Sequence, residues 1–273
     1  MIKRNIAAHN AIAEKYESLH GEIFNDVEQA RLRSKLAEAA GLIKAGNAEL
    51  RALDLGCGSG NLTVHLLELG FHVTAADVSE KFLDSIKRRF SGAGRLETAR
   101  LNGRDLSVFE DGRFNFTAAY SVLHHVPDYL AMTREMARVT GRGGVVFIDH
   151  ELSPDYWEQE PEYAAFLKDS RRHEDAMPES SRFFRVSTYI RKVKQLLNPR
   201  YISEGDIHVW PDDHLDWPEM EKILAETGFE VMIEDYLLFR RGCPQEVYSR
   251  YEKLCNDERL LVASRSWINR GNI

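Results

Sequence analysis

The sequence predicts an α/β fold of three layers, in which helices cover both faces of a doubly wound, mostly parallel sheet of seven strands. Two observations predict it. Strand-like and helix-like segments alternate between residues 50 and 150, and the connections between them are short and often contain glycine. Because crossovers between parallel strands are right-handed, such an alternation places successive helices against one sheet.

Each expected strand is a short apolar run, and each expected helix carries apolar residues three or four positions apart. The expected strands are 50–55, 71–76, 96–101, 116–123, 145–149, 229–239 and 260–264. The expected helices are 61–69, 79–90 with Ser79 as N-cap, 129–139 and 218–227, after two helices within 6–45 that break near His20. The alternation fails over residues 151–217, which we interpret as an insertion after the fifth strand.

Composition and charge limit the class of protein. A chain of 273 residues, 43% of them hydrophobic, can bury one α/β core and still supply a lid. The net charge of -7 makes nucleic acid an unfavoured partner. No signal-peptide pattern and no run of ~18 apolar residues occurs, so we expect a cytoplasmic protein that makes no membrane contact. The spacing of Cys57, Cys243 and Cys255 fits neither a zinc site nor a disulfide framework.

A glycine-rich loop, DLGCGSGN at residues 54–61, lies between the first expected strand and the next helix. Glycines allow a ligand close to the backbone, and the helix start offers unpaired N–H groups. In open α/β sheets, ligands bind at the carboxyl ends of strands, where this loop lies. A dinucleotide fingerprint would place its third glycine at Asn61, whereas here it is Gly60. Asp77 ends the second expected strand.

From about residue 50 to residue 150, this series of motifs resembles the class I, Rossmann-like S-adenosylmethionine-dependent methyltransferase family. The resemblance implies S-adenosyl-L-methionine as cofactor, with the glycine loop under its amino-acid part and Asp77 on both ribose hydroxyls. It places Asp105 near the adenine amino group, Leu106 beside the ring, and residues 121–128 beside cofactor and acceptor. The implied cofactor-binding residues are Tyr16, Asp54, Gly56, Gly58, Gly60, Asp77, Val78, Asp105, Leu106 and Ser121.

Four regions follow from the resemblance. Residues 1–48 are N-terminal helices covering the cofactor, and 49–150 are the cofactor-binding core. Residues 151–217 are an inserted substrate lid, and 218–273 complete the core sheet. Tyr16 is expected to close over the cofactor, the alternative being that it only anchors its helix to the core.

Methyl transfer is an in-line displacement at a carbon activated by positive sulfur, so aligning the acceptor matters most. An oxygen acceptor also gains from losing its proton, and histidine suits that task near neutral pH. The catalytic candidates are His125, His150 and His214. On a strand, His124 and His125 would point to opposite faces, so at most one should reach the methyl group.

Acidic residues and histidines also gather at 149–151 and 212–214, and such side chains can bind a divalent metal. Their spacing matches no metal motif, so no metal site is predicted. Whether a general base or a metal activates the acceptor stays open.

The insertion contains a basic stretch, because residues 180–203 hold six Arg or Lys and no Asp or Glu. Arg182 and Arg185 are therefore expected to bind an acceptor bearing phosphate or carboxylate. The alternative is the solvated basic face of a helix over 189–197. Trp210 is expected to wall the acceptor pocket or, alternatively, to pack the insertion onto the sheet.

The leading prediction is a methyltransferase acting on O or N of a small, anionic molecule, as a monomer or a homodimer. One alternative is an RNA (tRNA) modifying methyltransferase, which steeply salt-dependent tRNA binding would indicate. Another is a non-catalytic cofactor-binding protein, which would bind the cofactor without turnover. A fold alone does not decide between these functions.

Overall fold

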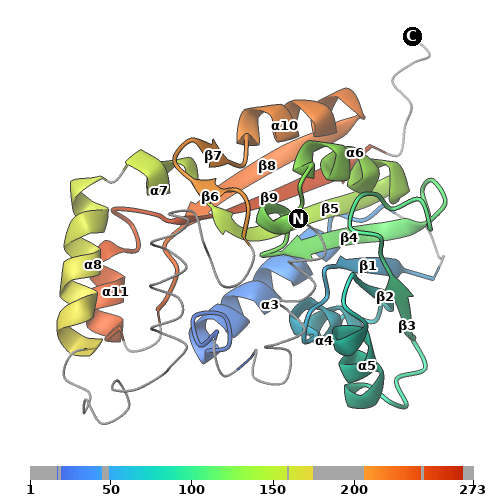
Figure 1. Cartoon of the computed structure of the whole chain (residues 1–273), viewed down its shortest axis with the longest axis horizontal. Helices are drawn as coiled ribbons and strands as arrows, with labels where there is room; N and C mark the ends of the chain where they lie inside the picture. The colour runs from blue at the N-terminus through green and yellow to red at the C-terminus, as the bar shows by residue number, and fades with distance from the viewer. Residues whose placement is uncertain are drawn as a thin grey trace, which may run out of the picture.

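The computed structural model describes residues 17, 20–44, 49–158, 160–174, 206–240 and 243–266. Within them, seven strands form one sheet in the order β3-β2-β1-β4-β5-β9-β8 (Figure 1). The strand pairs from β3 to β5 are parallel, whereas β9 lies antiparallel between β5 and β8. The predicted α/β class with a mostly parallel seven-stranded sheet is confirmed.

The elements follow the predicted alternation closely. The strands of the main sheet are β1 (Arg51–Leu55), β2 (His72–Asp77), β3 (Leu96–Arg100), β4 (Phe114–Tyr120), β5 (Thr140–Leu152), β8 (Phe229–Tyr236) and β9 (Glu258–Arg265). A separate hairpin consists of β6 (Val209–Trp210) and β7 (Asp213–His214). The helices are α3 (Asp26–Ala40), α4 (Asn61–Glu68), α5 (Glu80–Arg89), α6 (Tyr129–Val139), α7 (Pro154–Glu158), α8 (Pro161–Glu174), α10 (Trp217–Glu226) and α11 (Gln245–Tyr251).

Two apolar layers hold helices on the two faces of the sheet. Leu32 and Leu36 of α3 pack with Leu66 of α4 against one face. Met136 of α6 and Trp217 of α10 pack against the other. Because both faces are covered, the central strands are buried almost throughout, as is usual for parallel sheets. Figure 1 shows α3, α4 and α5 on one side of the sheet and α6 and α10 on the other.

The helices α7, α8 and α11 lie beyond one end of the sheet (Figure 1). Phe166 of α8 packs with Val247 of α11, and the Tyr251 hydroxyl donates a hydrogen bond to Asp169 (2.9 Å). Residues between β8 and β9 therefore pack with the insertion that follows β5. The region boundaries stay a prediction.

Two local differences from the predicted elements concern the site. The strand expected to reach residue 123 ends at Tyr120, and Leu123–His125 form a 3₁₀ turn, η2. Most of the helix predicted before His20 lies outside the described residues. The helix predicted at 189–197 lies wholly outside them. No helix in the described ranges combines the length and apolar composition needed to span a bilayer.

Candidate active site

The glycine loop joins β1 to α4 and has a left-handed backbone at Gly56 (φ +68°), Gly58 (φ +48°) and Gly60 (φ +99°). A Cβ on Gly56 would lie 2.6 Å from Cγ2 of Val122, so no larger residue fits there. A Cβ on Gly58 would have its nearest neighbour, the Gly56 carbonyl oxygen, 3.9 Å away. The backbone of Gly58 is thus open to a ligand.

The Asp77 carboxylate fixes this loop against the end of β2. Its Oδ2 accepts a hydrogen bond from the Gly58 N–H (3.1 Å), and its Oδ1 accepts one from the Ser79 N–H (2.7 Å). Burial raises the pKa of Asp77 to about 6, although these backbone N–H groups oppose the rise. The protein therefore holds a partly desolvated carboxyl group at the place where the sequence predicted the ribose.

Asp54 lies beneath the loop and is 1% exposed. Its Oδ2 accepts a hydrogen bond from the Thr63 hydroxyl (2.5 Å), which ties α4 to β1. Burial, together with the charge of Asp77, raises the pKa of Asp54 to about 7. The hydrogen bond from Thr63 connects Asp54 to α4, and Asp54 also borders a small cavity beside Phe24.

A cleft opens at the carboxyl ends of β1, β2 and β4, where ligands bind in open α/β sheets. It brings together six predicted site residues: Gly56, Gly58, Asp77, Val78, Ser121 and His125. The other lining residues are mainly apolar: Leu55, Phe82, Leu101, Gly103, Tyr120, Val122, Val126, Pro127 and Met132. Sequence reasoning missed Phe82, Leu101 and Gly103, although Leu101 and Gly103 directly follow the third strand.

Two predicted adenine contacts lie away from the described lining of the cleft. Asp105 is on the loop after β3, where its Oδ1 accepts hydrogen bonds from Asn102 Nδ2 (2.9 Å) and the Ser107 hydroxyl (2.5 Å). These bonds lower the pKa of Asp105. Leu106 is fully buried in the core with Met132. Both assignments stay predictions, and Tyr16, Arg182 and Arg185 lie outside the described residues.

Within the described part of the chain, two residues other than glycine have a left-handed backbone, and both lie at the ends of central strands. They are Ser121 after β4 (φ +56°) and His150 in β5 (φ +59°). The Ser121 N–H donates to the Asp149 carbonyl oxygen (3.0 Å), and the rings of Tyr120 and His150 are in tilted contact, with centroids 4.8 Å apart. Such strained backbone is concentrated at functional sites.

The buried Glu151 shapes the turn that follows Ser121. Its Oε1 accepts hydrogen bonds from the N–H groups of Val122 (2.8 Å) and Leu123 (2.6 Å). Its Oε2 lies 2.7 Å from Nδ1 of His124. Sequence reasoning had considered Glu151 only as a metal ligand, because 27 or more residues separate it from these partners.

His124 and His125 lie on η2 and not on a strand, so their rings do not point to opposite sides. The ring centroids are 4.1 Å apart. His125 lines the cleft, and its Nδ1 lies 3.4 Å from Oδ1 of Asp206. Burial raises the pKa of Asp206; the nearby Glu151 adds to the rise and His124 opposes it.

The other two catalytic candidates lie outside the described lining of the cleft. His150 is 9% exposed, its Nδ1 lies 4.0 Å from Glu258 Oε2, and burial lowers its pKa. His214 is in β7, where its ring packs edge-on against Trp157 (5.2 Å). Trp210 pairs with Asp213 across the same hairpin.

A buried ion network lies behind His150. The Arg31 guanidinium on α3 donates hydrogen bonds to Glu28 (2.5 Å and 2.9 Å), to Asp149 Oδ2 (2.8 Å) and to the Tyr236 hydroxyl (3.0 Å). The Tyr120 hydroxyl donates to Glu28 (3.0 Å). Burial acts to lower the pKa of Arg31, but the anionic groups around it, Asp149 foremost, raise it overall.

Comparisons with known proteins agree with this geometry. Residues 53–148 match a family model described as a methyltransferase domain. A "Ubiquinone biosynthesis O-methyltransferase" of Aromatoleum aromaticum is 32% identical over 38% of this chain and 44% of its own length. A "Demethylmenaquinone methyltransferase" of Staphylococcus aureus is 30% identical over 58% of this chain and 64% of its own length. The chain thus spans about half to two thirds of these relatives.

Residues 53–148 thus form a methyltransferase domain, in the class I fold that the sequence motifs resemble. A solved S-adenosylmethionine-dependent methyltransferase of Mesorhizobium loti shares the methyltransferase fold, with a TM-score of 0.53 and 19% identity over 84% of this chain and 96% of its own. The cofactor that this methyltransferase family implies is S-adenosylmethionine.

The residues present fit that cofactor. The open backbone at Gly58 leaves room beside the loop, and the Asp77 carboxylate lines the same cleft, as the predicted contacts with the amino-acid part and the ribose would require. Phe82, Leu101 and Met132 give the methyltransferase cleft apolar walls suited to a flat base.

Proposed function

We propose that this chain catalyses the transfer of a methyl group from S-adenosylmethionine to O or N of a small molecule by in-line displacement. The observation that carries this proposal is a single cleft bordered by the Gly58 backbone, the Asp77 carboxylate and the His125 imidazole. The first two suit the donor, and the third suits the acceptor.

S-adenosylmethionine supplies, when bound, a methyl group on a positively charged sulfur. The chain's own task is mainly to align the acceptor with that methyl group, and alignment can supply ~7–11 kcal/mol of the barrier. His125 activates the acceptor from the edge of the cleft, with Asp206 beside its Nδ1. Val126 and Pro127 border the same part of the cleft and restrict how the acceptor lies.

The proposed acceptor is a ring that bears an ionisable hydroxyl group. The names of the two relatives refer to ubiquinone biosynthesis and to demethylmenaquinone, and apolar residues such as Val122 and Met132 suit a ring. Ionising such a hydroxyl makes its oxygen nucleophilic. The sequence also predicts that Arg182 and Arg185 bind an anionic group of the acceptor.

Calorimetric titration with S-adenosylmethionine tests the donor site. Asp77→Ala should weaken binding at least about tenfold, because a hydrogen bond to a charged group contributes ~1.5–3 kcal/mol. Asp84→Ala, on the exposed side of α5, is the matched control and should bind as the unaltered chain does. Equal affinity in both variants would refute the donor site.

Isotopically labelled donor and a panel of hydroxylated aromatic compounds test the acceptor. Labelled product should form with the unaltered chain and fall at least 10²-fold in His125→Ala, the lower end of what acid–base assistance contributes. Donor binding without labelled product from any aromatic alcohol, amine or cell metabolite would instead favour a non-catalytic protein.

A further inference from the structure

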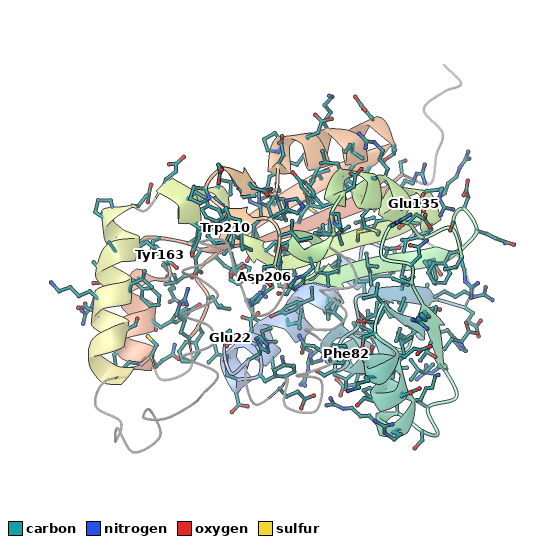
Figure 2. The ribbon with its side chains drawn as sticks, in the orientation of Figure 1. Glu22, Phe82, Glu135, Tyr163, Asp206 and Trp210 are labelled. Atoms are coloured by element: carbon teal, nitrogen blue, oxygen red, sulfur yellow. The ribbon has the colours of Figure 1, made fainter. Side chains whose placement is uncertain are left out.

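Three potential metal ligands meet beside the cleft, and one of them, His125, lines it. His124 and His125 come from η2, and Asp206 comes from a segment about 80 residues further along the chain. One ligand atom of each lies within 4.8 Å of the others, and all three side chains are partly buried. Figure 2 shows Asp206 near the centre of the molecule, by the tip of β4.

We propose that His124, His125 and Asp206 bind one divalent transition-metal ion, which ionises the acceptor hydroxyl. The proposal rests on the proposed function and deepens it, because it states how His125 activates the acceptor. It also departs from the sequence prediction of no metal site, which considered residues 149–151 and 212–214 instead.

The donor set selects the class of ion. Imidazole suits zinc, iron, nickel and copper, whereas magnesium and calcium prefer sites built from oxygen ligands. Among the described residues, two histidines and one carboxylate supply three protein ligands. Structural zinc sites have four protein ligands, whereas catalytic ones have three and leave a position for water or substrate. The cluster therefore has the composition of a catalytic site.

Glu151 provides a second, independent indication. A metal-bound histidine commonly donates its other ring N–H to a carboxylate, which fixes the tautomer and orients the ring. Glu151 Oε2 lies 2.7 Å from Nδ1 of His124, which is the arrangement of such a carboxylate and histidine pair. Two backbone N–H groups hold Glu151 Oε1 in turn. This arrangement restricts the orientation of the His124 ring more than that of a histidine on the surface.

The local charge also favours a cation. Two carboxylates border the histidine pair: the buried Glu151 beside His124 and the partly buried Asp206 beside His125. The Arg31 guanidinium is engaged by Glu28 and Asp149. A divalent ion between His124, His125 and Asp206 would offset this negative charge.

The reaction step uses the coordination position of the ion that the three protein ligands leave open. The acceptor hydroxyl oxygen binds at this position. Its O–H bond breaks and the proton is released to solvent, because a bound divalent ion lowers the pKa of an attached O–H group. The oxygen then forms the new bond to the methyl carbon. The carbon–sulfur bond breaks, and its electron pair stays on sulfur.

Metal titration of the tag-free, full-length chain tests the proposal. After treatment with a chelator and its removal, Zn²⁺ is added in a calorimeter, and Co²⁺ is added while its visible absorption is recorded. We expect one ion per chain. His124→Ala and Asp206→Asn should each weaken binding at least about tenfold, and Glu151→Gln about 10–100-fold. His72→Ala, a histidine at the opposite end of the sheet, is the matched control and should change nothing.

Titration with S-adenosylmethionine shows that each variant is folded, because the donor site does not include these residues. Absence of stoichiometric Zn²⁺ and Co²⁺ binding, or equal binding in His124→Ala, Asp206→Asn and the unaltered chain, would overturn the proposal. Methyl transfer that persists in the presence of chelator would refute the role of the metal but not the proposed methyltransferase function. Metal binding without methyl transfer to any acceptor would refute the proposed function but not the metal site.

Discussion

The buried ion pairs of Arg31 join α3 to the sheet directly behind the candidate site. The Glu28 and Asp149 side chains are 2% and 0% exposed, and the guanidinium lies 2.5 Å and 2.8 Å from their oxygens. In Arg31→Met the two carboxylates remain buried without this cation. Breaking a buried pair in this way costs about 3–5 kcal/mol, a large part of a typical total stability of ~5–15 kcal/mol.

Urea unfolding followed by circular dichroism measures this loss. Arg33→Met is the matched control, because Arg33 lies on the same helix but is 64% exposed and 3.9 Å from Glu68. We expect a change below about 1 kcal/mol for the control. Thermal midpoints should fall by roughly 6–20 °C in Arg31→Met. Adding Asp149→Asn to Arg31→Met should recover part of the loss, since it removes one buried charge. Similar losses in Arg31→Met and Arg33→Met would refute the reasoning.

Two further predictions concern the donor site. Gly56→Ala should lower the free energy of unfolding by about 1–3 kcal/mol and weaken donor binding, because Gly56 has φ +68° and the new Cβ would clash with Val122. Gly92→Ala is the control, because Gly92 also has a left-handed backbone (φ +97°) but a Cβ there would meet no neighbour. The control therefore measures the cost of the left-handed backbone alone. Equal unfolding midpoints for the two variants would contradict the clash. Burial raises the pKa of Asp54 to about 7, so the folded chain keeps a proton that the unfolded chain loses near pH 4. The contribution of Asp54 to the free energy of unfolding should therefore fall by on the order of 1–4 kcal/mol as the pH rises from about 4 to 7. Urea unfolding at pH 5 and pH 7.5 measures this change, which should be smaller in Asp54→Asn. An unchanged slope would contradict the raised pKa.

The sequence alone determined the features that depend on residues close together in the sequence, such as strands, helices, caps and the glycine loop. Apolar periodicity indicated each strand and helix of the core, and Ser79 caps its helix as predicted, accepting a hydrogen bond from the Phe82 N–H. The glycine loop was recognisable because left-handed backbone and close approach favour glycine wherever they occur. Since the carboxyl ends of parallel strands meet at one edge, Gly58 and Asp77 could be placed together in advance.

Only the tertiary structure decided the geometry of the acceptor end. His124 and His125 lie side by side because Glu151, from the next strand in the sheet, binds the backbone of their turn. Asp206 reaches them from a segment whose sequence carries no periodic signal. Contacts between residues so far apart depend on how strands, turns and insertions pack, and local sequence patterns do not encode that packing.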